Sequence, residues 1–134
     1  MNERLNGVSH RYPCPCCGYL VIDKPGTYDI CPICFWEDDD VQLRWPDFPG
    51  GANDPSLIDA QLNYIRLGAS EARVLPYVRP ATADDVRDPL WRAVDVRIDN
   101  IERYEPDNDL WPDDYTKLYW WRPTYWRANE SHRG

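Results

Sequence analysis

Residues 12–37 read YPCPCCGYLVIDKPGTYDICPICFWE, and this stretch holds all five cysteines of the chain. Four of them form two pairs, each with two residues between the cysteines and a proline directly after the first cysteine. These four residues are Cys14, Cys17, Cys31 and Cys34. Zinc takes four soft ligands at tetrahedral corners, about 2.3 Å from each sulfur, and a tight turn within each pair would point both thiolates into one site. Because proline pre-sets the backbone of that turn, the pattern predicts one Zn²⁺ ion bound by the four thiolates.

The residues between the two pairs fit a short β-hairpin that would bring the pairs together. Residues 18–22 and 27–30 are the expected strands, and residues 23–26 contain a Pro-Gly turn signal. Gly18 suits the left-handed conformation that usually follows a tight cysteine turn, or knuckle. The predicted architecture is therefore a zinc ribbon, which is a hairpin carrying two cysteine knuckles.

A closed site of four thiolates has no open coordination position, so this zinc is expected to be structural and not catalytic. The same spacing would also suit a pair of redox CxxC motifs or two disulfides. The fifth cysteine, Cys16, has the wrong spacing for a two-residue knuckle. It either packs as a small apolar side chain or serves as a reactive, redox-sensing thiol. His10 is interpreted as part of a polar tail, and His132 is given no role.

Length and charge restrict the class of protein. The 134 residues suit a single domain, residues 1–134. The formal net charge of −8 disfavours sequence-independent binding to nucleic acid and favours a basic protein partner. No apolar run is long enough to span a membrane, and the first ten residues do not resemble a secretory signal. The expected location is the cytoplasm, where thiols stay reduced and clustered cysteines favour metal over disulfides.

An acidic run and a helix come after the cysteines. The run is Glu37, Asp38, Asp39 and Asp40; it is interpreted as a solvated loop, or as a site for a basic partner. A helix is predicted over residues 55–67 from apolar residues at three- and four-residue spacing. Asn53 or Asp54 is the expected N-cap, and Gly68 the expected C-terminal stop.

Residues 81–134 form a C-terminal extension whose local structure the pattern leaves open. Asp88-Pro89 resembles a helix start, yet residues 94–98 alternate like a strand. Pro123 interrupts an aromatic segment at 115–127, which predicts a strand or short helix ending near residue 122. Its basic and aromatic residues include Trp120, Trp121, Arg122 and Trp126. These side chains suit a core, a protein interface, or a surface that stacks on single-stranded nucleic acid.

Three segments together resemble the bacterial cysteine-rich CPCC domain family. They are YPCPCCG at 12–18, ICPICFWEDD at 30–39, and GGAN at 50–53 before the helix. The resemblance covers residues 11–80. It implies a zinc-ribbon-like module that holds metal through the four knuckle cysteines, and it implies no established activity.

The expected fold is α+β: a small zinc ribbon packed on the 55–67 helix, with an aromatic-rich C-terminal extension. The leading functional hypothesis is a protein-interaction module with structural zinc, for example an acidic antitoxin or immunity protein that binds a basic partner. The alternatives are a nucleic-acid-associated zinc ribbon that uses Arg122 and the Trp cluster, and a thiol enzyme or redox sensor that uses Cys16. No sequence pattern points positively to an enzyme.

Overall fold

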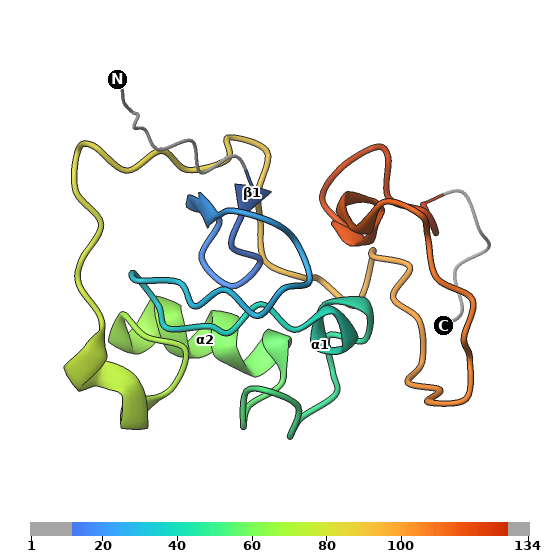
Figure 1. The fold of residues 1–134 in the computed structure, drawn as a ribbon, viewed down its shortest axis with the longest axis horizontal. Helices are drawn as coiled ribbons and strands as arrows, with labels where there is room; N and C mark the ends of the chain where they lie inside the picture. Colours follow the sequence, from blue (N-terminus) through green and yellow to red (C-terminus); the bar gives the residue numbers. More distant parts are fainter. Residues whose placement is uncertain (1–11, 129–134) are drawn as a thin grey trace.

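The computed structural model describes residues 12–128. Its regular elements are, in chain order, β1 (Tyr12–Pro13), β2 (Leu20–Ile22), α1 (Asp40–Arg44), α2 (Leu57–Leu67) and the 3₁₀ helices η1 (Ala72–Tyr77) and η2 (Tyr115–Leu118). The strands lie over α2, and the chain beyond η1 passes over the strands before its last part settles beside α1 (Figure 1). This is a small mixed α and β architecture, in agreement with the expected class.

The β-hairpin has a different partner from the one predicted. β2 pairs antiparallel with β1, in the register Tyr12 with Ile22 and Pro13 with Leu20. Residues 27–30, the predicted return strand, form no ladder with β2. Tyr28 has a positive φ of 65°, which an extended strand cannot accommodate. This segment instead lies against residues 36–38, where the Asp38 N–H donates to the carbonyl of Asp29 at 2.9 Å.

α2 is the predicted helix, and it starts two residues later than expected. Ser56 is the N-cap, since its hydroxyl accepts the N–H of Asp59 at 3.1 Å. Gly68 ends the helix in the left-handed conformation, with φ 84°. The expected cap Asn53 is buried instead. Its side-chain oxygen accepts the N–H of Glu37, and its side-chain NH₂ donates to the carbonyl of Glu37, each at 2.8 Å.

Within the described residues, the segment 88–101 forms neither the helix nor the strand that its sequence suggested. Residues 95–98 form a turn, in which the N–H of Ile98 donates to the carbonyl of Asp95 at 3.1 Å, and carboxylates take up neighbouring backbone donors. The N–H of Asp95 donates to the carboxylate of Asp99 at 2.7 Å, and Arg92 pairs with the same carboxylate. In the aromatic segment, regular structure is limited to η2.

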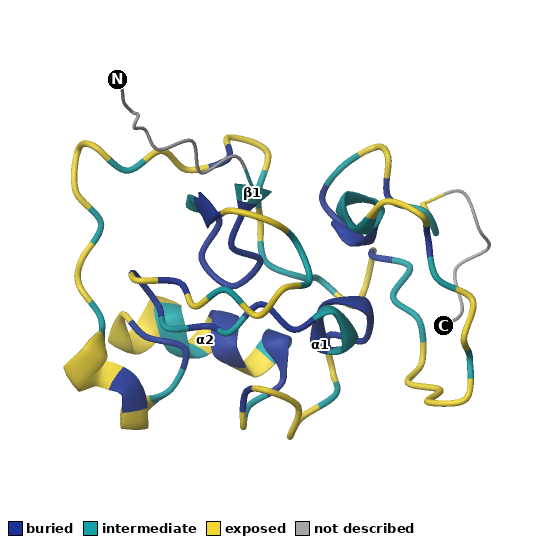
Figure 2. Cartoon of the chain, in the orientation of Figure 1, coloured by how far each residue is buried: buried dark blue, intermediate teal, exposed yellow. Residues whose placement is uncertain are grey.

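A single cluster of buried side chains includes residues of the cysteine-containing N-terminal part and of the aromatic C-terminal extension (Figure 2). It contains the cysteines, Val21 and Ile22 of β2, Leu57 and Ala60 of α2, and the aromatic residues at 119–121 and 125. Within residues 12–128, no helix has the length and apolar character needed to cross a membrane. His10 and His132 lie outside the described residues.

Candidate metal centre

Two turns of matching geometry present the cysteines. In the first knuckle, residues 14–19, the N–H of Gly18 donates to the carbonyl of Cys14 at 2.7 Å. In the second, residues 31–36, the N–H of Phe35 donates to the carbonyl of Cys31 at 2.8 Å. Both N–H donors have a left-handed backbone, with φ 85° at Gly18 and 68° at Phe35. The predicted role of Gly18 is thus confirmed, and the second knuckle makes the same turn with a phenylalanine.

The four predicted ligands meet at one buried point. The sulfur atoms of Cys14, Cys17, Cys31 and Cys34 all lie within 4.8 Å of one another, and all four residues have 0% exposure. The Cys14–Cys34 sulfur distance is 3.6 Å and the Cys17–Cys31 distance is 3.7 Å. Disulfide sulfurs are about 2.05 Å apart, so these thiols are free. Tetrahedral zinc with bonds of about 2.3 Å places its sulfurs about 3.8 Å apart, and the cluster therefore fits such an ion.

The surroundings of the cluster favour ionisation of Cys31 over that of Cys14 and Cys34. Burial opposes ionisation of Cys31, but hydrogen bonds from the other three thiols hold its pKa well below the usual range. The N–H groups of Ile33 and Cys34 also point at this sulfur, at 3.3 and 3.4 Å. Burial raises the pKa of Cys14 and of Cys34 well above the usual range. A divalent cation among the four sulfurs would offset this crowding and let all four ionise.

Cys16 lies beside the cluster and is not one of the four ligands. It occupies the position of the first knuckle that Ile33 occupies in the second, and both side chains have 0% exposure. Burial raises the pKa of the Cys16 thiol, which disfavours the thiolate that redox chemistry requires. The packing interpretation of Cys16 is the one that its surroundings support.

Comparison with known families agrees with this geometry. The family described as cysteine-rich CPCC matches residues 12–85, which includes both knuckles and α2. The chain belongs to the cysteine-rich CPCC family. No curated protein matches the sequence. The family match ends at residue 85, so residues 86–128 of the extension lie beyond the CPCC module.

The acidic run of the CPCC module is mostly structural. Asp38 and Asp39 are buried, with exposures of 2% and 4%, so the interpretation of a fully solvated run is wrong. Asp39 caps α1 through the N–H of Val41 at 2.8 Å and also accepts the N–H of Ala52 at 2.9 Å. Asp38 accepts the N–H of Gly26 at 2.8 Å. Only Glu37 and Asp40 are partly exposed.

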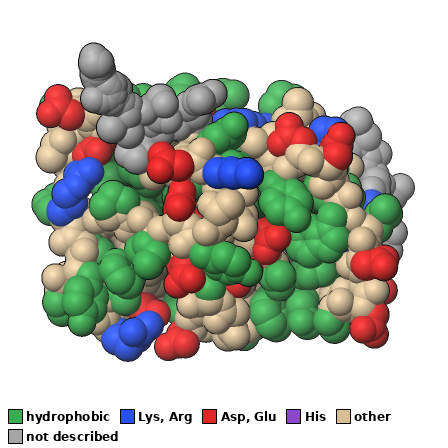
Figure 3. Space-filling view, viewed as in Figure 1, with side chains coloured by type: hydrophobic (Ala, Val, Ile, Leu, Met, Phe, Trp, Pro, Cys, Tyr) green, Lys and Arg blue, Asp and Glu red, His purple; other side chains and the backbone are tan. Residues whose placement is uncertain are grey.

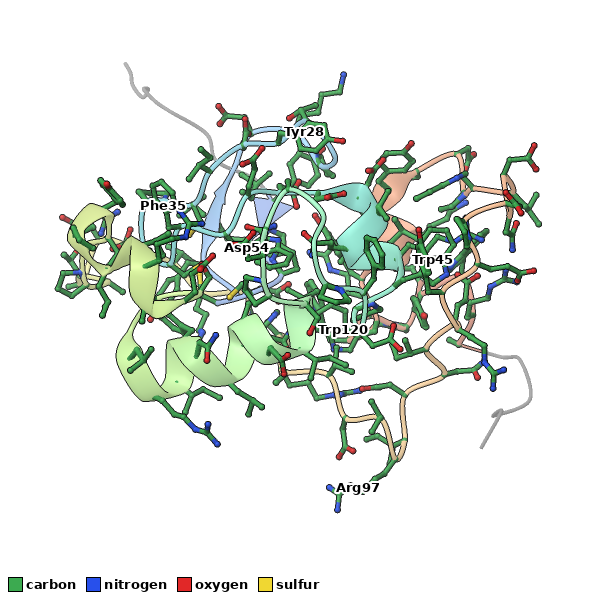
Figure 4. All side chains as sticks on the ribbon, turned by 90° about the horizontal axis from the view of Figure 1, so that it is seen from below. Tyr28, Phe35, Trp45, Asp54, Arg97 and Trp120 are labelled. Carbon is green, nitrogen blue, oxygen red and sulfur yellow. The ribbon has the colours of Figure 1, made fainter. Side chains whose placement is uncertain are left out.

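The aromatic segment beyond the CPCC module is largely core. Trp120 and Trp121 have exposures of 4% and 7%, and their indole N–H groups donate to the carbonyl of Arg92 and the carboxylate of Asp88. Arg122 pairs with the same carboxylate at 3.3 Å. Trp126 is half-buried against the Arg44 guanidinium, 5.0 Å from its ring centre. In Figure 4, Trp120 lies in the interior, whereas Arg97 projects away from the body.

The sequence did not predict the polar side chains that form hydrogen bonds between the CPCC module and the extension. Arg44 has a fully buried side chain, and its guanidinium binds both carboxylate oxygens of Glu102, at 3.0 and 3.1 Å. Gln61 of α2 donates to the carbonyl of Pro15 and accepts the N–H of Val94, both at 3.0 Å. A charged residue between Leu43 and Trp45 is the one sequence signal that could have drawn attention to Arg44.

Proposed function

We propose that the protein is a cytoplasmic protein-interaction module in which one zinc ion, bound by the four knuckle cysteines, holds the fold, and that its acidic surface binds a basic protein. The observation that carries the proposal is the closed cluster of four buried sulfurs. Four protein ligands leave no position for substrate. The function therefore resides on the surface that the metal site supports.

The charge of that surface favours a basic partner. The net charge is −8, and carboxylates are spread more widely than Lys and Arg over the face in Figure 3. Exposed carboxylates on the extension include Glu105, Asp107 and Asp109. Such a field steers association with a protein of opposite charge. An immunity or antitoxin protein that covers a basic toxin is one concrete form of this function.

The two alternatives have less support. Stacking on nucleic acid requires accessible rings, whereas Trp120 and Trp121 are buried and Arg122 is paired with Asp88. A thiol enzyme or sensor requires an accessible thiolate, whereas Cys16 is fully buried. Each alternative therefore lacks the accessible group that its chemistry needs.

Two measurements test the proposal. Metal analysis of protein purified under reducing conditions is expected to give about one zinc per chain; a chain that folds without bound zinc would overturn the metal part. For the partner, the wild-type protein and a Glu105→Lys, Asp107→Lys, Asp109→Lys variant serve as matched baits in host extract. The wild type is expected to retain a basic protein that elutes at high salt, and the variant is expected to lose it. Equal recovery by both baits, at equal zinc content, would overturn the basic-partner part.

A further inference from the structure

The two knuckles have equivalent carbonyl groups, and among the described residues those beyond the CPCC module bind the carbonyls of the first knuckle but not those of the second. In the second knuckle, the carbonyl of Pro32 accepts the N–H of Arg79 at 3.2 Å. The carbonyl of Cys34 accepts the N–H of Ser70 at 2.8 Å. Both donors belong to the CPCC module, so the module supports its second knuckle itself.

The first knuckle receives only part of its support from the module, and the rest comes from beyond the family match. The carbonyl of Pro15, equivalent to that of Pro32, accepts a hydrogen bond from Gln61 of α2 and one from the indole N–H of Trp91, both at 3.0 Å. The carbonyl of Cys17, equivalent to that of Cys34, accepts the Nε–H of Arg87 at 2.8 Å.

Backbone contacts place the segment that carries these side chains alongside the first knuckle. The N–H of Asp88 donates to the carbonyl of Gly18 at 2.8 Å, and the N–H of Leu20 donates to the carbonyl of Val86 at 2.8 Å. Residues 86–91 thus run directly along the first knuckle.

We propose that residues 86–91 are a clamp that completes the metal centre, with Arg87 and Trp91 as positioning residues that hold the first knuckle closed and slow the release of the metal. The proposal rests on the zinc site proposed above. Release of the ion requires at least one knuckle to open. Opening the first knuckle would break the hydrogen bonds that the clamp makes to Pro15, Cys17 and Gly18.

Close packing makes the clamp specific to this knuckle. The ring of Trp91 lies so near Gly18 that a β-carbon there would come within 2.7 Å of the indole. The guanidinium of Arg87 lies over the rings of both Tyr19 and Trp91, with its carbon 5.0 and 4.9 Å from their centres. This contact fixes the cation beside a centre that carries two net negative charges once four thiolates bind one divalent ion.

The clamp is anchored to the aromatic core of the extension. Asp88 has an exposure of 8%, and its carboxylate accepts the indole N–H of Trp121 at 3.0 Å and pairs with Arg122. Its other oxygen accepts the N–H of Leu90 at 2.9 Å. The buried aromatic segment therefore holds residues 86–91 in place against the metal centre.

The test is the rate at which excess chelator removes zinc from the loaded, full-length protein. Arg87→Met is expected to accelerate release on the order of tenfold, the size typical of outer partners of metal ligands. Arg87→Lys keeps the cation and a donor and is expected to restore most of the slow release, which loss of packing alone would not predict. Trp91→Phe keeps a ring against Gly18 but loses the indole donor, and it is expected to accelerate release severalfold.

Two control variants match these substitutions away from the clamp. Arg97→Met removes an exposed guanidinium that pairs with Asp95. Trp126→Phe removes a buried indole N–H for which the described residues supply no acceptor. Both controls are expected to release zinc at the wild-type rate.

The outcomes separate this proposal from the one on which it rests. A wild-type chain that folds without zinc would overturn the zinc site itself. Zinc-loaded wild type with unchanged release in Arg87→Met and Trp91→Phe would overturn the clamp alone. So would equal acceleration by the control variants, or Arg87→Lys releasing zinc as fast as Arg87→Met.

Discussion

The CPCC module, residues 12–85, and the described extension, residues 86–128, achieve order in different ways. The module contains both α-helices and both strands, whereas the extension contains one 3₁₀ helix of four residues, η2. Cysteine sulfurs lie at the centre of the module, and aromatic rings and guanidinium groups fill the extension. Figure 2 shows that both parts have a buried interior, although a long loop of the extension is exposed.

This difference shows what each part requires to stay folded. Binding of structural zinc by thiolates contributes on the order of 10 kcal/mol or more to the folding of small zinc domains. A module with such a site needs only a small apolar core. Single cation–π and ring contacts contribute roughly 0.5–2 kcal/mol each. The extension therefore depends on many contacts, some within its own aromatic segment and others with residues of the module.

Arg44 is the main junction between the two parts. It lies at the end of α1 in the module, and its ion pair partner Glu102 lies in the extension. The rings of Trp45 and Trp111 lie 4.4 and 4.6 Å from its guanidinium carbon. Loss of the metal and loss of this junction should therefore have separable consequences.

The largest expected effect is that of removing one proposed zinc ligand. Cys31→Ser should abolish zinc binding and unfold the module, because the remaining three thiols cannot close the tetrahedral site. Metal analysis and thermal unfolding by circular dichroism measure both consequences. Cys16→Ala is the matched control, expected to keep one zinc per chain and to lose roughly 1 kcal/mol for the small cavity that it leaves. Full zinc content in Cys31→Ser would contradict the assignment.

The next largest effect is expected at the junction. Arg44→Met leaves the partly buried Glu102 carboxylate with Arg127 as its remaining ion-pair partner, at 3.3 Å, and should lower the free energy of unfolding by roughly 1.5–3 kcal/mol, the size of hydrogen bonds to a charged group. Zinc content should stay at the wild-type value, because the hydrogen bonds of the Arg44 guanidinium go to Glu102 and Asn108, outside the knuckles. Urea unfolding in zinc-containing buffer and metal analysis measure the two quantities.

Two further variants sharpen this experiment. Arg97→Met breaks an exposed ion pair, with the Arg97 side chain 85% exposed, and should change stability by less than about 1 kcal/mol. Adding Glu102→Leu to Arg44→Met should recover part of the loss, because the carboxylate that has lost its two-bond partner is then removed as well. Loss of zinc in Arg44→Met would show that the two parts are not separable.

The cluster of four cysteine sulfurs was predictable from sequence because its geometry is local. Two cysteines three positions apart, with a proline between them, restrict the turn so strongly that the four clustered residues follow from spacing. Helix α2 was predictable for a similar reason, since its apolar spacing and Gly68 act within a few turns. The start of α2 was misplaced because Asn53 is as good a cap as Ser56 in isolation, and burial against Glu37 decides between them.

The hairpin and the extension were not predictable because distant contacts determine them. No sequence signal marks Tyr28 for a left-handed backbone, so residues 27–30 resembled a strand. Trp91 and Pro15 are 76 positions apart, and Arg44 and Glu102 are 58 apart. The acidic run was misread for the same reason, because its amide donors, such as those of Gly26 and Ala52, come from other loops.

Asp38 provides a smaller, pH-dependent effect inside the module. Burial, helped by Asp29, Asp39 and Asp40 and opposed by the Gly26 N–H, raises the pKa of Asp38 to about 6. The unfolded value is about 3.9, so the folded chain binds more protons between these values, and stability falls as pH rises through 6. The change between pH 5 and 7.5 should be roughly 1–1.5 kcal/mol. Asp38→Asn should remove this dependence.

The measurement for Asp38 is urea unfolding of both zinc-saturated proteins across this pH range. The informative quantity is the difference in unfolding free energy, Asp38→Asn minus wild type. It should increase with pH, because only the wild type must bury an ionised group at pH 7.5. Any fixed cost of the amide shifts this difference equally at every pH. A difference that stays flat would show that Asp38 is already ionised in the folded protein at pH 5.

The smallest effect compares one helix cap in each part. The Ser56 hydroxyl caps the eleven-residue α2, which packs on the first knuckle through Gln61, and Ser56→Ala should cost about 1 kcal/mol. Asp114 caps η2 by accepting the N–H of Thr116 at 2.9 Å, but it is exposed and its helix has four residues. Asp114→Ala should therefore cost less than half as much. Urea unfolding of both variants measures the two losses of unfolding free energy. A loss at Asp114 equal to or larger than that at Ser56 would mean that the folded structure of the extension depends on local helix capping as well as on aromatic contacts.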